Sequence, residues 1–278
     1  MFLILGSPRS GTTLLARILD AHPHVVIPVE TDFIVPVAFI CHRVRDEQVG
    51  RSLATSLIVS STMFKNSLKW FIREPEVEAV VAGAEYSTYG IVSAIYEKIR
   101  YNDWARFVGD KSPNDLTDLP ILFQTGFFDR DVKVIHLVRD VRDVVLSLLP
   151  LGWAEHDAEG TFARSWSNAN LYAFDRLHTR PDQYLLLRYE QLACDPTMTM
   201  ESVCAFLGVD FRAEMLEPSR RRFWWDREPH QHLAGEAITT DRVGLWRAGM
   251  DAVLRARCER QAAEALAHFG YPLGLERG

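Results

Sequence analysis

Short apolar runs alternate with helical patterns along the chain. Directly after the first run, Leu14, Leu15, Ile18 and Leu19 recur at helical spacing. The runs themselves are Phe2–Leu5, Phe107–Val108, Val132–Val138 and Tyr184–Leu187. Continuous apolarity over so few residues is typical of strands that are buried on both faces. Alternation with helices therefore predicts an α/β fold in which a central parallel sheet forms the middle of three α/β/α layers.

Other helical patterns fill the rest of the chain. One face carries Phe162, Trp166, Ala169, Ala173 and Leu177, and another carries Val253, Leu254, Cys258, Ala262, Ala265 and Phe269, with Gly270 and Pro272 as stop signals. Residues 31–100 are helical in pattern without a convincing strand, so we expect a helical insertion that covers one end of the sheet. Because no linker or internal repeat divides the chain, we expect a single domain over residues 1–278.

Composition narrows the class of protein without naming a function. The chain has 278 residues, 47% of them hydrophobic, and a net charge of -6, which argues against a general nucleic-acid binder. No apolar stretch is long enough for a membrane span, and the apolar start lacks the features of a signal peptide. Four scattered cysteines predict reduced thiols rather than a metal site. We therefore expect a cytoplasmic protein without a bound metal.

The turn after the first strand has the spacing of a phosphate-binding loop. In "GSPRSGTTLL", Gly6 and Gly11 match the Walker A pattern, but Thr12 stands where that pattern has lysine, and the cation comes earlier, at Arg9. A strand, a turn and a helix start direct backbone N–H groups and the positive end of the helix dipole at one point. We expect an anion site of the P-loop type, formed by Pro8, Arg9, Ser10, Gly11, Thr12 and Thr13.

A second cation follows a second predicted strand. Arg139 ends the run "VIHLV", at the place where a nucleoside triphosphatase has an acidic residue for Mg²⁺. Open parallel sheets bind ligands at the carboxyl ends of their strands. Two cations there favour a ligand with two separated phosphates. A P-loop kinase or nucleotide-binding protein that acts on ATP with Mg²⁺ is the alternative.

These two motifs resemble those of sulfotransferases that use 3′-phosphoadenosine 5′-phosphosulfate (PAPS). The segments are "PRSGTTLL" and "VRDVRDVVLS". The resemblance implies that the first binds the 5′-phosphosulfate, and that Arg139 and Ser147 bind the 3′-phosphate. It also implies PAPS as co-substrate, no metal, and a hydroxyl group of a small molecule or peptide as the acceptor of the sulfuryl group.

Further segments are similar to the tyrosylprotein sulfotransferase branch. They are "DAHP" with the glutamate that follows, "DKSP" and "RYEQLACDP". The resemblance implies Glu30 as catalytic base, Lys111 as catalytic lysine beside Arg9, and Tyr189 near the nucleotide. Enzymes of that branch have a membrane anchor and disulfides, which this chain is not expected to have. We therefore expect a soluble, bacterial-type member whose acceptor need not be a protein tyrosine.

The segment "TTDRVGLWRAGM" is loosely similar to the one that closes over the co-substrate. It implies roles for Thr239, Arg242 and Arg247. The basic and aromatic stretch Arg220–Arg242 is interpreted either as a lid over a charged ligand, within about residues 220–245, or as a surface loop with its aromatic side chains in the core. The insertion and the loops 151–159 and 220–242 are expected to shape the acceptor pocket. As alternatives to Glu30 the chain offers His22, His24 and His136. We expect His22 to cap a helix and His136, inside an apolar strand, to be a hydrogen-bonded core residue. The sequence makes no prediction of oligomeric state.

Overall fold

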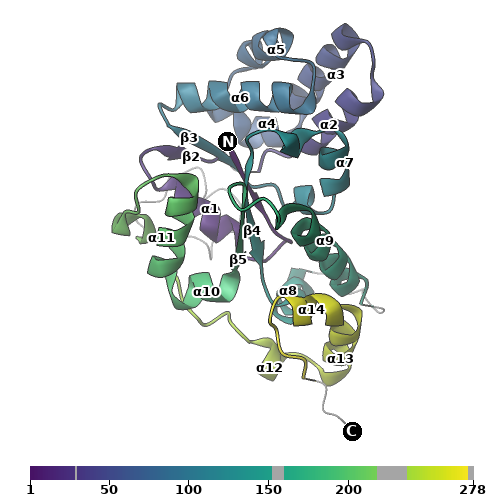
Figure 1. Ribbon diagram of the computed structural model, residues 1–278, viewed down its shortest axis with the longest axis vertical. Helices are drawn as coiled ribbons and strands as arrows, with labels where there is room; N and C mark the ends of the chain where they lie inside the picture. The colour runs from purple at the N-terminus through teal and green to yellow at the C-terminus, as the bar shows by residue number, and fades with distance from the viewer. Residues whose placement is uncertain (29, 152–159, 218–236, 275–278) are drawn as a thin grey trace.

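Parallel strands form one sheet at the centre of the molecule (Figure 1). The computed structural model describes residues 1–28, 30–151, 160–217 and 237–274, and within them the sheet has five strands in the order β2-β3-β1-β4-β5. The strands are β1 (Phe2–Leu5), β2 (Val25–Val26), β3 (Phe107–Asp110), β4 (Lys133–Val138) and β5 (Tyr184–Arg188). All four pairings are parallel, and Leu3 of β1 lies between Asp110 of β3 and Val134 of β4. The predicted sheet is confirmed.

The first strand buries side chains on both of its faces. Phe2 and Ile4 belong to a core shared with helices on one side of the sheet, which are α1 (Thr12–Asp20), α10 (Tyr189–Cys194) and α11 (Pro196–Leu207). Leu3 and Leu5 belong to the core on the other side, which includes α7 (Leu119–Gln124) and α9 (Thr161–Leu177). Figure 1 shows α11 and α9 on opposite sides of the strands. The predicted three layers are therefore present.

The short strand β2 was not predicted. It consists of Val25 and Val26 alone, which pair with Phe107 and Val108 of β3. Two residues carry no recognisable periodicity, so only the pairing with a distant segment defines this strand. It matters for the site because the chain reaches Glu30 four residues after the end of this strand.

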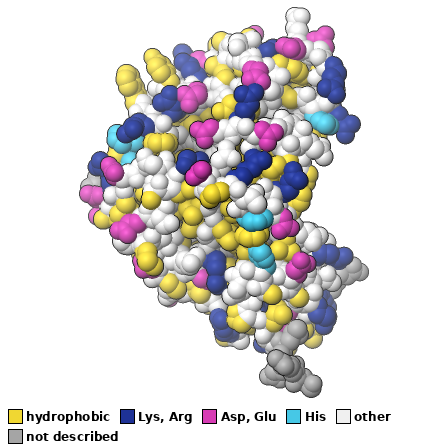
Figure 2. Space-filling model, in the orientation of Figure 1, with side chains coloured by type: hydrophobic (Ala, Val, Ile, Leu, Met, Phe, Trp, Pro, Cys, Tyr) yellow, Lys and Arg dark blue, Asp and Glu magenta, His cyan; other side chains and the backbone are white. Residues whose placement is uncertain are grey.

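The segment between β2 and β3 is helical, as predicted. Its helices are α2 (Ile34–Arg43), α3 (Glu47–Ser60), α4 (Thr62–Asn66), α5 (Glu74–Gly83) and α6 (Thr88–Asn102), with the short 3₁₀ helix Leu68–Trp70. The side chains of Asp46, Ser61 and Ser87 cap three of these helices by accepting backbone N–H bonds. Figure 2 shows side chains of both charges interspersed over this end of the molecule.

The last part of the chain packs beyond the carboxyl ends of the strands. It comprises α12 (Trp246–Gly249), α13 (Ala252–Gln261) and α14 (Ala263–His268), which pack near α8 (Val141–Leu148) and α9. The expected continuous apolar face from Val253 to Phe269 is partly wrong. The helix breaks at Ala262, and Val253, the second residue of α13, is 64% exposed.

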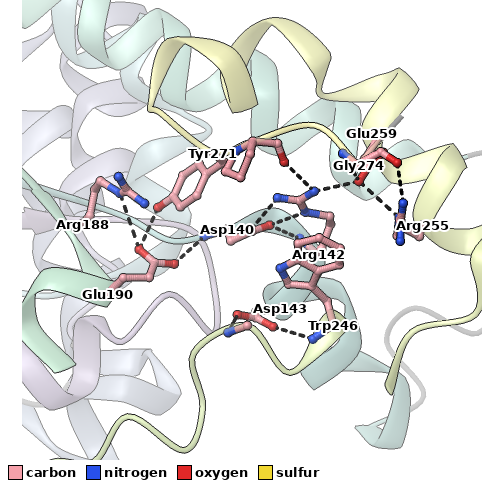
Figure 3. A network of polar contacts seen from close by, with 12 residues as sticks. Asp140, Arg142, Asp143, Arg188, Glu190, Trp246, Arg255, Glu259, Tyr271 and Gly274 are labelled. Atoms are coloured by element: carbon pink, nitrogen blue, oxygen red, sulfur yellow. Dashed lines mark hydrogen bonds and ion pairs between the residues drawn. The ribbon is translucent and has the colours of Figure 1, made fainter. Parts of the chain in front are cut away.

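A buried arginine joins this C-terminal part to the sheet (Figure 3). Arg142, in the first turn of α8, donates from Nε and Nη2 to the two carboxylate oxygens of Asp140 at 2.9 and 2.7 Å. Its Nη1 donates to Glu259 of α13 at 2.7 Å and to the carbonyl of Pro272 at 2.9 Å, and its guanidinium stacks 3.7 Å from the ring centre of Trp246. One fully buried cation thus connects the turn between β4 and α8 with α12, α13 and the segment after α14.

Two further observations concern the described residues. None of the four cysteines, all in described segments, forms a disulfide. No helix within the described ranges is both long and apolar enough to cross a membrane.

We predict that Arg142→Met lowers the free energy of unfolding by about 3–5 kcal/mol, because it leaves the carboxylate of Asp140 buried without its cation and leaves Glu259 with only the 3.4 Å ion pair to Arg255. Urea denaturation measures the loss. The matched control is Arg130→Met, which breaks an exposed ion pair with Glu85 and is expected to cost less than about 1 kcal/mol. Equal losses in the two variants would contradict the structural role of Arg142.

Candidate active site

The loop between β1 and α1 forms a tight turn against two other elements. A Cβ atom at Gly6 would lie 2.7 Å from the carbonyl oxygen of Leu137, and Gly11, with φ of 93°, packs against the ring of Tyr189. Arg9 also has a left-handed backbone, with φ of 67°, which is costly for a residue with a side chain and is characteristic of functional loops. Gly11 caps α1 without a side-chain hydrogen bond, so the first N–H groups of the helix face the loop.

Arg139, at the end of β4, connects this loop to the C-terminal segment. Its Nη1 donates to the carbonyl of Arg9 at 2.9 Å, and its Nη2 donates to the carbonyl of Arg242 at 2.6 Å. The guanidinium stacks 4.3 Å from the ring centre of Tyr189. The two cations that the sequence places after separate strands therefore lie side by side.

The loop is strongly electropositive. Burial, and then the positive charges of Arg139 and Arg242, lower the pKa of the Arg9 guanidinium from its ordinary value. Within the described segments, the buried hydroxyl of Ser10 and the buried Nε of Arg139 have no hydrogen-bond partner. Unused donors in a positive environment fit bound anions such as phosphate groups.

Glu30 and Lys111 form an ion pair at the neighbouring strand ends. The Nζ of Lys111, directly after β3, donates to Oε1 of Glu30, which follows β2. The lysine is 1% exposed, whereas the glutamate is 24% exposed. The base and the lysine implied by the resemblance are therefore in direct contact, with the carboxylate on the more accessible side.

A buried hydrogen-bond network fixes the backbone around this pair. The hydroxyl groups of Thr31 and Tyr96 each donate to Oδ1 of Asp110 at 2.7 Å. The backbone N–H groups of Thr31 and Asp32 donate to Oγ of Ser112 at 3.3 and 3.1 Å. Residues on both sides of Lys111 thus hold the two residues that follow Glu30.

Asp32 is a carboxyl group that the sequence did not single out. Burial, followed by the negative charges of Glu30 and Asp110, raises the pKa of Asp32 from an ordinary value of 3.8 to about 6. Its backbone is left-handed, with φ of 49°. An aspartate two residues from a candidate base is an unremarkable sequence pattern, and only the folded structure places it beside Glu30, Asp110 and Lys111.

Parallel pairing brings the candidate residues to one edge of the sheet. In sheet order, β2 leads to Glu30, β3 to Lys111, β1 to the loop of Arg9, β4 to Arg139 and β5 to Tyr189. Each strand therefore delivers one sequence-predicted residue to the edge where open α/β sheets bind ligands. Figure 1 shows α8, α10 and α12 beyond this edge.

The remaining predicted residues differ in how closely they approach the loop. Ser147 lies on α8 and donates its hydroxyl to the carbonyl of Val144 at 2.8 Å. Arg242 reaches the site through its carbonyl, whereas the exposed Arg247 stacks on Trp246, 4.8 Å from the ring centre, and the exposed Thr239 accepts a bond from the backbone N–H of Asp241. Of the predicted lid and pocket loops, residues 152–159 and 220–236 lie outside the described ranges.

Two of the histidines that were considered as alternatives to Glu30 have other hydrogen-bond partners. His136 is fully buried and hydrogen-bonds to Tyr184 at 2.7 Å and to Asn170 at 2.9 Å, and burial lowers its pKa to about 4. The predicted core role of His136 is confirmed. His22 does not cap a helix with its side chain, since it contacts the carbonyl of Asp210 and accepts the N–H of His24.

With fold and site in view, the chain belongs to the sulfotransferase family, whose sequence model matches residues 2–213. It is similar to a putative protein-tyrosine sulfotransferase of Caenorhabditis briggsae, with 24% identity over 223 residues, or 78% of this chain and 68% of that one. Human sulfotransferase 2A1 is 34% identical over 119 residues, which is 35% of this chain and 39% of the human protein. Membership in the PAPS-dependent family, predicted from the motifs, is confirmed.

A solved structure resembles nearly the whole chain. The sulfotransferase domain of the Synechococcus PCC 7002 olefin synthase superposes with a TM-score of 0.68 at 25% sequence identity. The superposition covers 98% of this chain and 95% of that one. The similarity therefore extends beyond the matched region of the family model, to the C-terminal helices.

We predict that Asp32→Asn stabilises the protein at neutral pH but not in acid. A carboxyl whose pKa is raised on folding favours the folded state below its unfolded pKa, and that advantage is lost as the pH rises through the folded value of about 6. The variant should therefore match the wild type near pH 4 and gain about 1–2 kcal/mol near pH 8, less than the roughly 3 kcal/mol of the full shift because solvent screens this partly exposed group. Asparagine also tolerates the left-handed backbone.

Chemical denaturation at both pH values measures this difference. The control is Asp175→Asn, an exposed position on α9. An Asp32→Asn gain that does not change with pH would contradict the raised pKa of Asp32.

Proposed function

We propose that this protein transfers the sulfuryl group of PAPS to a hydroxyl group of a small molecule or peptide. The observation that carries the proposal is the sheet edge itself, where Glu30, Lys111, Arg9, Arg139 and Tyr189 follow the five strands in spatial order. Three of these side chains are cations and one is a carboxylate. Such an edge suits a doubly phosphorylated nucleotide at one end and a hydroxyl that must lose a proton at the other.

The donor would lie across the middle of the edge. The loop N–H groups and the guanidinium of Arg9 would hold the 5′-phosphosulfate, since a helix start and a charged fork both favour such a group. Arg139, with Ser147 on the helix that follows, would hold the 3′-phosphate. Tyr189 packs against both Gly11 and Arg139, which supports a position beside the nucleoside.

Glu30 and Lys111 would act on the two oxygens that exchange the sulfuryl group. The acceptor oxygen attacks sulfur in line, its proton passes to the carboxylate of Glu30, and the bond from sulfur to the bridging oxygen of the 5′-phosphate breaks. The ammonium group of Lys111 stabilises the negative charge that develops on that bridging oxygen. The products are the sulfated acceptor and adenosine 3′,5′-bisphosphate (PAP).

The contacts of Asp140 favour this donor over ATP with Mg²⁺. Asp140 follows Arg139 and is the first acidic residue after β4, where a nucleoside triphosphatase would bind its metal. Both of its carboxylate oxygens accept bonds from the buried Arg142. Thr12, where the Walker A lysine would stand, is buried at the start of α1.

We predict that Glu30→Gln abolishes sulfuryl transfer and leaves the Kd for PAP within about threefold of the wild type, because the amide cannot accept the acceptor's proton. The measurement uses PAPS with a labelled sulfuryl group and a panel of phenols, aliphatic alcohols, sugars and tyrosine peptides. The matched control is Glu85→Gln, which alters a glutamate in an exposed ion pair. Wild-type turnover in Glu30→Gln would remove Glu30 from the mechanism.

We predict that Arg139→Ala raises the Kd for PAP by about 10- to 100-fold, because it removes a charged donor to the 3′-phosphate. Isothermal titration calorimetry measures the change. Arg176→Ala is the control, since Arg176 also stacks on an aromatic ring, that of Phe123, away from the phosphate loop. An unchanged Kd in Arg139→Ala would contradict its assignment.

A further inference from the structure

A single carboxylate fixes the C-terminal segment that Arg139 contacts. Asp143, in the first turn of α8, is 3% exposed. Its Oδ2 accepts the backbone N–H of Gly244 at 2.7 Å, and its Oδ1 accepts the backbone N–H of Trp246 at 2.9 Å. Figure 3 shows Asp143 facing this segment, with Trp246 between it and Arg142. Both carboxylate oxygens are thus used to hold one short stretch of backbone.

That stretch of backbone carries the carbonyl that binds Arg139. Arg242 is two residues before Gly244, and its carbonyl accepts from Nη2 of Arg139 at 2.6 Å. The other terminal nitrogen of Arg139 donates to the carbonyl of Arg9 in the phosphate loop at 2.9 Å. The guanidinium is therefore held on one side by the loop and on the other by a segment whose position depends on Asp143.

The local backbone supports a fixed rather than a loosely attached segment. Gly244 has φ of 74°, a turn that favours glycine, and Trp246 is 5% exposed beneath the guanidinium of Arg142. A carboxylate that accepts two backbone N–H bonds at a helix start is also stabilised by the helix dipole. Removing the carboxylate leaves two N–H groups without acceptors and frees the carbonyl of Arg242 to move.

We infer that Asp143 is a positioning residue for nucleotide binding, which acts through the carbonyl of Arg242 to aim the guanidinium of Arg139 at the 3′-phosphate. Arg139 has five N–H donors, and the two carbonyls fix its plane while others stay directed at the ligand. The inference rests on the proposed function, because it assumes a nucleotide with a 3′-phosphate.

The test compares two ligands that differ only in that phosphate. Titration calorimetry gives the Kd for PAP and for adenosine 5′-phosphate, and the ratio of the two reports the contribution of the 3′-phosphate. We expect Asp143→Ala to reduce the wild-type preference for PAP by about tenfold or more while changing the affinity for adenosine 5′-phosphate little. Asp143→Asn, which keeps one acceptor oxygen, should give a smaller reduction and serves if the alanine variant does not fold.

The matched control is Asp251→Ala. Asp251 also accepts two backbone N–H bonds, from Val253 at 2.9 Å and Leu254 at 3.1 Å, but it caps α13 and does not contact Arg139 or Arg242. We expect it to leave the preference for PAP unchanged. Hydrogen exchange should show faster exchange of the Gly244 and Trp246 amides in Asp143→Ala and not in Asp251→Ala.

A double variant separates positioning from general destabilisation. If Asp143 acts through Arg139, Asp143→Ala combined with Arg139→Ala binds PAP no more weakly than Arg139→Ala alone. Additive losses, or a preference for PAP that survives in Asp143→Ala, would overturn the inference. Failure of the wild type to prefer PAP over adenosine 5′-phosphate would instead overturn the proposed function, while the exchange experiment would still report on the contact of Asp143.

Discussion

The parallel pairing of β1 with β3 and β4 is the constraint on which the rest of the site depends. It places the loop between β1 and α1 between the strand that leads to Lys111 and the strand that leads to Arg139. The outer strands β2 and β5 then add Glu30 and Tyr189 at the two ends of the same edge. Residues separated by more than a hundred positions in the sequence come together because parallel strands all end on one side.

The two arginines of the segment "VRDVRD", Arg139 and Arg142, have different roles. Arg139 keeps donors at the edge of the site and is fixed by two backbone carbonyls, whereas Arg142 is enclosed by Asp140, Glu259 and Trp246. Asp143 links the surroundings of both arginines, because it holds the backbone between Arg242, which contacts Arg139, and Trp246, which stacks on Arg142. The C-terminal helices are thus anchored to the segment that fixes Arg139, the residue proposed to bind the 3′-phosphate.

The sequence predicted most of the sheet, because four of the five strands are apolar runs of ordinary appearance. It also placed Arg9 and Arg139 at the carboxyl ends of two strands of a parallel sheet, but their contact through the carbonyl of Arg9 is seen only in the structure. It missed β2, which is two residues long, and it singled out Arg139 but gave no role to Arg142. Arg142 is buried against Glu259 and Pro272, which lie 117 and 130 residues away in the sequence. The raised pKa of Asp32 likewise depends on burial and on Asp110, which no local pattern reports.

The edge of the sheet is proposed to bind a nucleotide with separate 3′- and 5′-phosphates. The most direct measurement is calorimetric titration of the protein with PAP in the presence of a chelator, compared with ADP and ATP with and without Mg²⁺. We predict that PAP binds at least about tenfold more tightly than either, and that the chelator does not weaken it. Tightest binding of ATP with Mg²⁺ would contradict the account.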